Sequence, residues 1–399
     1  MIKKIIKLVL KYFILFIFKL LDYFPIKKKT ILIQTIDPFL FTDNTMYLFL
    51  YLSKKKNINI YWITNSLKIS KFLKKKKLKF INPKINIFNY FFQLYKSKII
   101  IDSGTKYFNP LGITDSLGKL KITTMHGLGL KTVPGKKTKK IEISDFNKFD
   151  YVSFTSEFTK NNIGKKLFKI KSEKLIILGY PRYDQYFNKK KLQISKKKKI
   201  ISKSLVNLNL KKNSKIIYYT PTWRPYNYKL PIKEFKNFDF YNFDNFLEKN
   251  NYYFFYTKHY MTNDNKIPSF KRIFEIDRNI DPMFDTSMFF KEVDLLLNDY
   301  ATTSTAASIL EIPQIFIMPD YEKYTKTKGF VENYKNNLIG PEAKNYKDLK
   351  KIIKSYLINK NNYSRSFKNK IRKYKKKYYN FDEINNSANK YYKFIDKII

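Results

Sequence analysis

The sequence contains two histidines, and each directly follows a run rich in apolar residues. His126 lies in the segment KITTMHGLGLKT, with Gly127 and Gly129 after it and Lys131 near the end. A neutral imidazole can accept a proton near pH 7, and glycines let the backbone approach a ligand closely. Six of the ten glycines lie between residues 104 and 135. This pattern predicts a ligand-binding loop in which His126 is the base.

The second histidine, His259, lies in FFYTKHY, again at the end of an apolar run. A lone histidine is more often a structural residue with satisfied hydrogen bonds than a catalytic one. Because both histidines follow apolar runs, the catalytic interpretation is favoured, in which both belong to one site.

Two of the six arginines stand at turns that follow apolar runs. Arg182 lies in LGYPRYD and Arg224 lies in YTPTWR, and a proline fixes the backbone of each turn. A guanidinium can make bidentate contacts with phosphate or carboxylate groups. The pattern favours a phosphate site, although ordinary turn chemistry would place the same residue types here.

Hydroxyl side chains gather where a later helix is expected to begin. In DLLLNDYATTSTAAS, the run LLLN predicts a buried strand, and Thr302, Thr303 and Ser304 begin the helix that follows. Free backbone N–H groups at a helix start attract anions. We expect an anion site here, with a simple helix cap as the alternative.

These segments need a fold that brings strand ends together, and the apolar pattern predicts one. Short apolar runs alternate with helical periods in two successive stretches, which is the βαβ arrangement of a parallel sheet. The predicted strands are 30–35, 58–64, 98–101, 215–220, 253–257, 293–298 and 315–318, and the predicted helices include 44–52, 87–95, 243–249 and 303–310. The sequence therefore predicts an α/β fold of two doubly wound, Rossmann-like domains with the site in a cleft between them.

The expected organisation has five parts. They are an N-terminal helix over 1–28, a first domain over 29–190, a basic linker over 191–214, a second domain over 215–355 and basic C-terminal helices over 356–399.

The N-terminal segment predicts a membrane-associating amphipathic helix. Its longest stretch without charge, Tyr12 to Phe18, is far shorter than the roughly 20 residues that span a bilayer. At 100° per residue five of the charged side chains share one narrow face, and Ile, Leu, Val and Phe side chains occupy the rest; these five are Lys3, Lys4, Lys7, Lys11 and Asp22. Such a helix suits the interface of an anionic membrane. The alternative is a helix packed on the protein's own core.

Composition excludes several classes of protein. There is no cysteine, which excludes a disulfide framework, and two histidines leave almost no room for a zinc site. The net charge is +48, but only six of the 80 basic residues are arginine, and lysine is spread along the whole chain. This distribution disfavours nucleic acid as the partner and favours anionic lipid or a phosphate-bearing substrate.

The order of the motifs carries more information than any one of them. The series HGLGLK, GYPRYD, YTPTWR, TKHY, LNDYATTS and YEKYTKTKGFVENYKNNLIGP, within roughly residues 30–355, resembles the CDP-glycerol glycerophosphotransferase family of teichoic acid, cell-wall and capsular polymer synthesis. The resemblance implies the GT-B architecture, with an acceptor domain followed by a CDP-donor domain. It also implies a bacterial peripheral membrane protein on the cytoplasmic face of the cell membrane.

The resemblance further implies which residues act. His126 would be the base and His259 a phosphate-contacting partner. The donor diphosphate would lie among Arg182, Arg224, Asp299, Thr302, Thr303, Ser304, Gly127 and Lys131, and a pocket loop would contain Gly329, Phe330, Gly340 and Pro341. The implied reaction moves an alditol phosphate from a CDP-linked donor to a lipid-linked or capsular glycan acceptor. No cofactor and no metal are expected, and the chain has no D-x-D motif.

Four positions depart from the family pattern. Met125 replaces a tryptophan, Tyr260 a proline, Lys328 an arginine and Ala306 an acidic residue. The last change puts the identity of the donor in doubt, so a GT-B glycosyltransferase that uses a nucleotide sugar is the second hypothesis. A non-catalytic protein that binds nucleic acid or lipid is the third.

Overall fold

The computed structural model describes residues 2–24, 30–104, 108–127, 146–187, 210–224, 226, 229–258, 268–276, 282–380 and 386–399, with side chains from residue 5 onward. The chain forms two compact units. Unit 1 contains Met1–His126, Lys140–Asp184 and Asn386–Ile399, and unit 2 contains Gly127–Lys139 and Gln185–Asn385.

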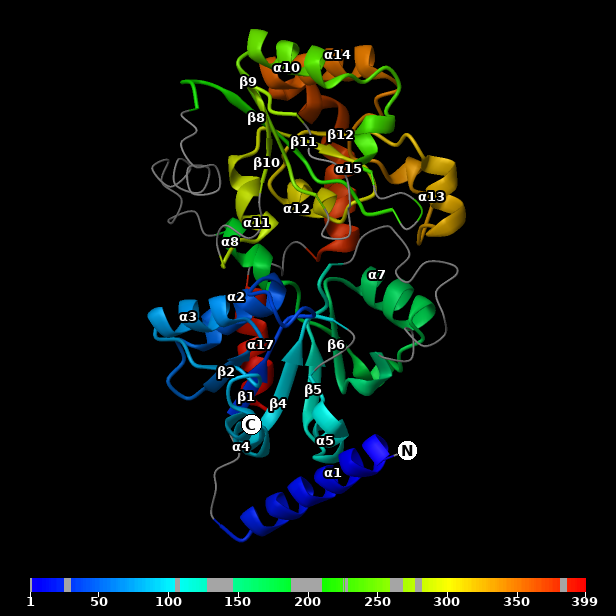
Figure 1. Cartoon of the computed structure of the whole chain (residues 1–399). Helices are drawn as coiled ribbons and strands as arrows, with labels where there is room; N and C mark the ends of the chain where they lie inside the picture. The colour runs from blue at the N-terminus through cyan, green and yellow to red at the C-terminus, as the bar shows by residue number, and fades with distance from the viewer. Residues whose placement is uncertain are drawn as a thin grey trace. The chain divides into compact units, whose positions relative to one another are not determined.

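Unit 1 is built on a seven-stranded sheet in the order β3-β2-β1-β4-β5-β6-β7, and its neighbouring strands pair in parallel (Figure 1). The strands are β1 (Thr30–Ile33), β2 (Asn59–Ile63), β3 (Phe80–Ile81), β4 (Ser97–Asp102), β5 (Leu120–Thr123), β6 (Tyr151–Phe154) and β7 (Leu175–Ile177). The interior strand β1 has the sequence TILI and is buried throughout. A strand covered on both faces needs such a continuous apolar run.

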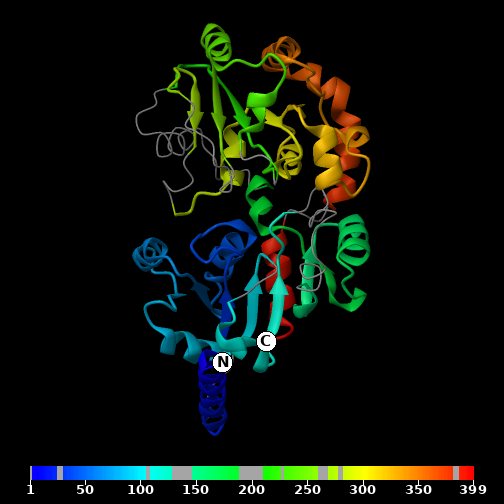
Figure 2. The same cartoon turned by 45° about the vertical axis from the view of Figure 1, so that its right-hand side comes forward.

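Helices cover the sheet of unit 1, and the last of them comes from the far end of the chain. The helices are α2 (Asp43–Leu52), α3 (Leu67–Lys75), α4 (Ile87–Lys96), α5 (Ile113–Ser116), α7 (Glu157–Thr159), which continues as a π-helix over Lys160–Leu167, and α17 (Ser387–Asp396). Helix α17 packs beside α2, as Figures 1 and 2 both show. The carboxylate of Asp184 accepts hydrogen bonds from the backbone N–H groups of Ser387 and Ala388, both at 2.8 Å, and so caps α17.

Unit 2 also has a parallel sheet with helices, and its five strands lie in the order β10-β9-β8-β11-β12. Its strands are β8 (Lys215–Tyr219), β9 (Tyr252–Tyr256), β10 (Ile273–Glu275), β11 (Leu295–Asn298) and β12 (Gln314–Phe316). Its helices are α10 (Phe240–Lys249), α11 (Thr286–Phe289), α12 (Thr303–Ile309), α13 (Tyr321–Thr327), α14 (Tyr346–Ile358) and α15 (Lys360–Tyr378). The short helix α8 (Asp184–Phe187) lies where the chain passes from unit 1 to unit 2.

The alternation predicted from the sequence is confirmed in both units. Each predicted strand is present within two or three residues of its expected bounds, and each sheet is parallel. Each sheet also has a switch point, where successive strands turn to opposite sides. It lies between β1 and β4 in unit 1 and between β8 and β11 in unit 2. Ligands of open α/β sheets bind outside the carboxyl ends of the strands at such points.

Helix α1 (Ile2–Leu21) forms as expected (Figure 1), but most of its described side chains are exposed. Among its described side chains only Phe18 is buried, against the ring of Tyr95 at a centroid distance of 5.3 Å. The hydroxyl of Tyr95 also donates to Asp22 at 2.7 Å. Ten apolar side chains of α1 stay exposed: Ile5, Ile6, Leu8, Val9, Leu10, Tyr12, Phe13, Phe16, Ile17 and Leu20. A helix packed on the protein's own core would bury this arc, so the structure disfavours that alternative.

Within the described part of the chain, no helix is both long enough and apolar enough to cross a bilayer. The expected linker over 191–214 lies largely outside the described residues. The expected basic tail over 356–399 is helical but is divided between the units, because α15 belongs to unit 2 and α17 to unit 1.

Candidate active site

The loop that carries His126 leaves the carboxyl end of β5, and the side chain of His126 is exposed. The preceding residue, Met125, has φ of 56°, a left-handed conformation that is uncommon for any residue but glycine. The hydroxyl of Thr123 accepts from the N–H of Met125 at 3.2 Å and donates to the carbonyl of Gly104 at 2.9 Å. The backbone on the N-terminal side of His126 is therefore held in one unusual conformation.

Asn44, near the start of α2, holds this loop from the other side. Its side chain is fully buried, and its amide nitrogen donates to the carbonyl of Met125 at 2.6 Å. Its amide oxygen accepts from the backbone N–H of Arg182 at 3.4 Å. One buried amide therefore links the His126 loop to the GYPRYD turn, two segments that the sequence singled out separately.

Arg182 itself faces a carboxylate of its own unit. Its guanidinium forms an ion pair with Asp43, a buried residue whose φ of 73° is also left-handed. Strained backbone of this kind persists only where surrounding contacts enforce it, and it clusters at functional sites. The contact of Arg182 with a donor phosphate stays a prediction.

Asp102 ends β4, at the switch point of unit 1. Its fully buried carboxylate accepts from the side-chain amide of Gln34 at 2.6 Å and from the N–H of Gly104 at 2.5 Å. Burial raises the pKa of Asp102 to about 7, because these hydrogen bonds only partly offset the loss of hydration. Sequence reasoning did not select Asp102, although a lone acid that ends the run KIII and precedes SG was the available signal.

In unit 2 the switch point holds a buried ion cluster centred on Arg224. The guanidinium donates to Asp299 at 2.6 Å and to both carboxylate oxygens of Asp320, at 2.7 and 2.9 Å. Arg224 is 2% exposed and Asp299 is not exposed. Burial alone would lower the pKa of Arg224, but the two carboxylates hold it well above its usual value.

Tyrosines complete this cluster. The hydroxyl of Tyr300 donates to Asp320 at 3.1 Å, and the hydroxyl of Tyr226 also bonds to that carboxylate. The rings of Tyr300 and Tyr324 stack at a centroid distance of 4.1 Å, with the guanidinium of Arg224 4.7 and 5.3 Å from their centres. Burial would raise the pKa of Asp320, but bonds from Arg224 and the two hydroxyls lower it, so Asp320 is held as a carboxylate.

The cluster joins the loops that leave β8 and β11. Asp299 accepts from the N–H of Thr222 at 3.0 Å, and also from the N–H of Tyr300 and of Ala301 in its own loop. This arrangement departs from the expectation for Arg224, because all three of its guanidinium nitrogens already donate to protein acceptors. In this structure Arg224 fixes the two loops and presents no free N–H fork to a phosphate.

The predicted hydroxyl cluster lies at the start of α12. The hydroxyls of Thr303 and Thr220 are 2.6 Å apart, so this helix start is tied to the exit of β8. The hydroxyl of Ser304 is buried and donates to the side chain of Gln314 at 2.8 Å. A β-carbon added at Gly127 would lie 3.4 Å from the hydroxyl of Thr302, so this glycine lies close against the same helix start.

The expected pocket loop divides into two parts. Phe330 stacks on Tyr334 at 4.4 Å and adjoins Tyr300, beside Gly329, whose φ is 76°. Gly340 packs so tightly that a β-carbon would lie 2.2 Å from a carbonyl of β12, and the carbonyl of Pro341 accepts from that strand at 2.8 Å. The first part supports the ion cluster, and the second extends the sheet.

The structure thus brings together most of the predicted residues, unit by unit. His126 and Arg182 share one hydrogen-bonded assembly in unit 1. The predicted residues that gather around the switch point of unit 2 are Arg224, Asp299, Thr302, Thr303, Ser304, Gly127, Gly329 and Phe330. His259 and Lys131 lie outside the described residues, so their roles, and a cleft shared by the two histidines, stay predictions. Sequence reasoning missed Asp43, Asn44, Asp102 and Asp320.

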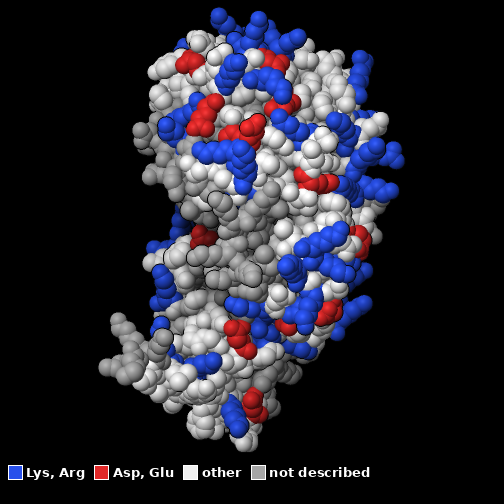
Figure 3. Space-filling model, turned by 90° about the vertical axis from the view of Figure 1, so that its right-hand side faces the viewer, with Lys and Arg blue, Asp and Glu red and all other residues white. Residues whose placement is uncertain are grey.

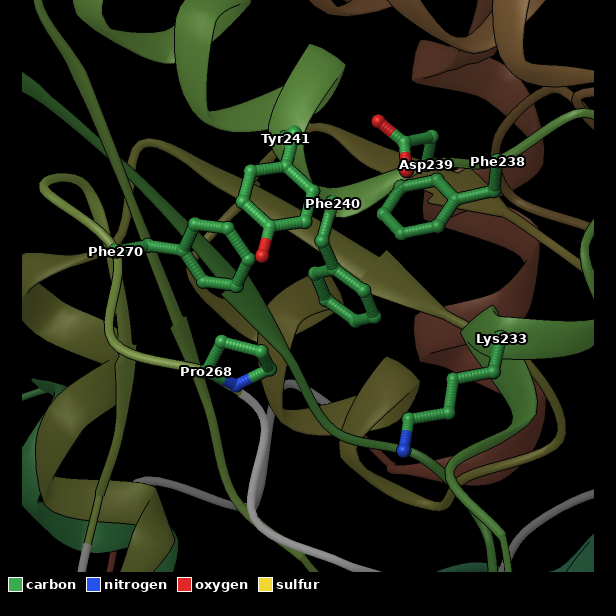
Figure 4. Close-up of a pocket in the computed structure, with 7 residues that line it drawn as sticks. All are labelled: Lys233, Phe238, Asp239, Phe240, Tyr241, Pro268 and Phe270. Carbon is green, nitrogen blue, oxygen red and sulfur yellow. The ribbon is translucent and has the colours of Figure 1, made fainter.

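Unit 2 also has a hollow of about 190 Å³ that contains none of the predicted residues (Figure 4). Its lining is mainly aromatic, with Lys233 and Asp239 as the charged members; the others are Phe238, Phe240, Tyr241, Pro268 and Phe270. Asp239 accepts from the N–H of Asn242 at 2.8 Å and so caps α10. Because it lies apart from the strand exits of the ion cluster, we do not include it in the candidate site.

Two doubly wound parallel sheets with polar residues fixed at their switch points define an α/β fold of the GT-B type. The sequence model of the family described as CDP-glycerol:poly(glycerophosphate) glycerophosphotransferase matches residues 15–397. The chain belongs to this family, as the motif series predicted.

Individual relatives agree with the family. The chain is 28% identical to the teichoic acid glycerol-phosphate primase of Bacillus subtilis over 272 residues, which is 63% of this chain and 64% of the relative. It is 26% identical to the teichoic acid glycerol-phosphate transferase of Staphylococcus aureus over 86% of this chain and 88% of the relative. A teichoic acid poly(glycerol phosphate) polymerase of Staphylococcus epidermidis is 28% identical, over 62% of this chain and 36% of the relative. The chain thus spans only about one third to two thirds of the first curated relatives it matches.

Solved structures agree on the fold. A structure of the wall teichoic acid polymerase TagF has a TM-score of 0.72 and 22% identity, and the match covers 100% of this chain and 97% of that one. A UDP-GlcNAc 2-epimerase from Neisseria meningitidis has a TM-score of 0.53 and 14% identity, over 92% of this chain and 100% of the other. At these identities the likeness establishes the fold alone, and the α/β fold predicted from the sequence is confirmed.

Proposed function

We propose that this protein transfers glycerol phosphate, or another alditol phosphate, from a CDP-linked donor to a teichoic acid or related glycan acceptor and releases CMP. The family match over residues 15–397 carries the proposal. Motif residues expected from that family support it, because His126 and Arg182 follow strands of unit 1 and Arg224 and Asp299 follow strands of unit 2.

The proposed step is a displacement at the phosphorus that bears the alditol. An acceptor hydroxyl forms a new P–O bond, and the P–O bond to CMP breaks. His126 takes the hydroxyl proton, and the buried Asn44 fixes the backbone that aims the imidazole. Such a step depends mainly on positioning and on stabilising the phosphate oxygens.

On the donor side, the cluster of Arg224, Asp299 and Asp320 acts as a frame. It fixes the exits of β8 and β11, and with them the start of α12, where the diphosphate is proposed to lie against Thr302 and Thr303. A frame of this kind holds the loops in place before the donor arrives, which reduces the reorganisation needed at the transition state.

Release of CMP tests this function. Purified protein is incubated with CDP-glycerol or CDP-ribitol and a lipid-linked acceptor, and UDP- and GDP-sugars are run in parallel. We expect CMP from a CDP-alditol and a loss of about 10²–10⁴-fold in turnover for His126→Ala, with unchanged CMP binding and unfolding midpoint. Release of UDP or GDP alone would support the glycosyltransferase hypothesis instead, and no nucleotide release from any donor would refute both.

We also propose that α1 attaches the protein to the cytoplasmic face of the cell membrane, with anionic lipid as the partner. The exposed apolar arc of α1 supports this proposal. Two double variants change the charge equally: Val9→Glu with Phe13→Glu disrupts the apolar arc, and Lys7→Gln with Lys11→Gln leaves it intact. Sedimentation with phosphatidylglycerol vesicles should fail for the first pair, whereas the second should weaken binding mainly at low salt. Equal loss in both would contradict insertion of the apolar arc.

A further inference from the structure

The arginines that the structure describes differ in their environments. Arg224 and Arg272 are 2% and 4% exposed, and Arg182 is paired with Asp43. Arg278 lies outside the described residues. The remaining two, Arg365 and Arg372, are exposed on α15 (Lys360–Tyr378). In a chain that uses 74 lysines, two exposed arginines on one helix need an explanation.

These arginines belong to a stripe of four cations along α15, which we call the α15 stripe: Arg365, Lys368, Arg372 and Lys376. Spacings of three, four and four residues place the side chains within about 80° of one another, over about 16 Å of helix. All four are exposed. Figure 2 shows α15 on the outer side of unit 2.

Neighbouring lysines on the same helix behave differently. Lys375 pairs with Glu311 at 2.8 Å and Lys377 pairs with Glu332 at 2.5 Å, and these pairs hold α15 on the body of unit 2. Among the residues that the structure describes, no acid forms an ion pair with any member of the stripe. Lys375 and Lys377 thus help to hold α15 in place, whereas the four stripe residues are exposed on it.

The surroundings of the stripe are free of acid in sequence as well. Residues 349–380 contain twelve lysines and arginines but neither aspartate nor glutamate, although the whole chain has 32 acids for 80 basic residues. On the face that Figure 3 shows, most of the charged side chains are basic, and acidic side chains lie among them. The stretch 349–380, which contains most of α14 and all of α15, therefore carries side-chain charge of one sign only.

The stripe does not suit membrane insertion. None of the large apolar side chains that are exposed in the described structure lies on α15, whereas ten lie on α1. The stripe offers only charged groups, arranged in a line along the helix, and two of them are guanidinium groups that can contact a phosphate bidentately. Such a surface suits a partner whose phosphates repeat along an extended chain.

We propose that the α15 stripe binds a linear phosphodiester polymer, with Arg365 and Arg372 each contacting a phosphate bidentately and the two lysines neutralising phosphates between and beyond them. The polymer's identity rests on the proposed function: it would be the growing poly(alditol phosphate) chain. Binding there would hold the product on the enzyme between successive transfers.

The test compares two quadruple variants of the full chain with the same change of charge. The first replaces Arg365, Lys368, Arg372 and Lys376 by glutamine. The second, the matched control, replaces the exposed unit 2 lysines Lys211, Lys212, Lys236 and Lys249 by glutamine. Binding of linear inorganic polyphosphate is measured against salt concentration.

We expect at least a tenfold weaker affinity for the stripe variant, with the slope of log K against log salt smaller by about three, as four lost phosphate contacts would give. The control should change by less than threefold. Equal losses in both variants would overturn the proposal, because net charge alone would then explain binding.

Two further measurements separate the remaining outcomes. If the stripe variant keeps polyphosphate binding but loses binding to phosphatidylglycerol vesicles, the stripe contacts lipid and the proposal is wrong. CMP release with a short acceptor should be unchanged in the stripe variant, while products on a polymeric acceptor become shorter. If the wild type releases no CMP from any CDP-alditol, the proposed function fails, and the polyphosphate comparison still decides whether the stripe binds a polyanion.

Discussion

The sharpest prediction concerns Asn44, whose amide reaches two separate loops. Replacing it by alanine removes the donor to the Met125 carbonyl at 2.6 Å and the acceptor for the Arg182 N–H at 3.4 Å. The Met125 carbonyl then keeps only the longer hydrogen bond from the Thr124 hydroxyl, at 3.4 Å, in a site where Asn44 itself was fully buried. The left-handed backbone that precedes His126 is no longer held from that side.

The expected magnitudes follow from these contacts. Each lost hydrogen bond costs about 1 kcal/mol, and a buried carbonyl that keeps only the long bond from Thr124 costs about 1 kcal/mol more. We therefore expect Asn44→Ala to lower the free energy of unfolding by about 3 kcal/mol. A displacement of His126 by about 1 Å would lower kcat by about 10²-fold. KM for the CDP-alditol should change less, because Asn44 contacts neither of the loops that leave β8 and β11 and meets Arg182 only at its backbone N–H.

Urea unfolding and steady-state CMP release measure the two effects separately, at a temperature where the variant is fully folded. Thr45→Val is the matched control, because Thr45 is equally buried next to Asn44 and its hydroxyl has no hydrogen-bond partner. It should stay within about 0.5 kcal/mol of the wild type. If Asn44→Ala loses stability but keeps kcat, Asn44 is merely structural; if it keeps both, the reasoning about the loop is refuted.

Three further outcomes are expected. Asp320→Asn should lower the free energy of unfolding by about 3 kcal/mol in urea titrations, because it leaves part of the Arg224 guanidinium without a charged partner; a change below 1 kcal/mol would contradict the frame. Because the pKa of Asp102 is raised to about 7, the native state keeps a proton that the unfolded chain releases above about pH 4, so stability falls as pH rises from about 4 to about 7. Asp102→Asn should remove about 1.4 kcal/mol per pH unit of that slope, and an unchanged slope across a pH series would disprove it. Gly340→Ala should cost about 2 kcal/mol by thermal or urea unfolding, since its β-carbon would overlap a carbonyl of β12.

The sequence was sufficient for the fold, because the relevant signals are local. Runs such as TILI and LLLN are short and apolar, and helical periods separate them, so the strands and their parallel pairing follow from the pattern. The same patterns place His126, Arg182, Arg224 and Thr302 after strands. What they cannot give is which side chain each of these residues meets, because that depends on strand order.

Arg224 illustrates the limit. Its type and its turn favour a phosphate contact, but its two carboxylate partners come from 75 and 96 residues further along the chain. Asn44 lies 81 residues from Met125 and gives no signal of its own in the pattern of helix α2. Pairings over such separations appear only once β8 and β11, or β1, β4 and β5, are neighbours.

Helix α17 (Ser387–Asp396) packs in unit 1, far from it in sequence, and this affects how the protein folds during synthesis. Helix α17 supplies the fully buried Tyr391 and Ile395 to unit 1. Its Ser387 packs so closely on Gly179 that a β-carbon at that glycine would lie 2.4 Å from the Ser387 hydroxyl. The core that starts with the first strand therefore closes only after residues 386–399 have left the ribosome. Until then unit 2 can fold, while the core of unit 1 stays incomplete and its apolar side chains stay exposed. A chaperone or a protease would act on the chain during this period.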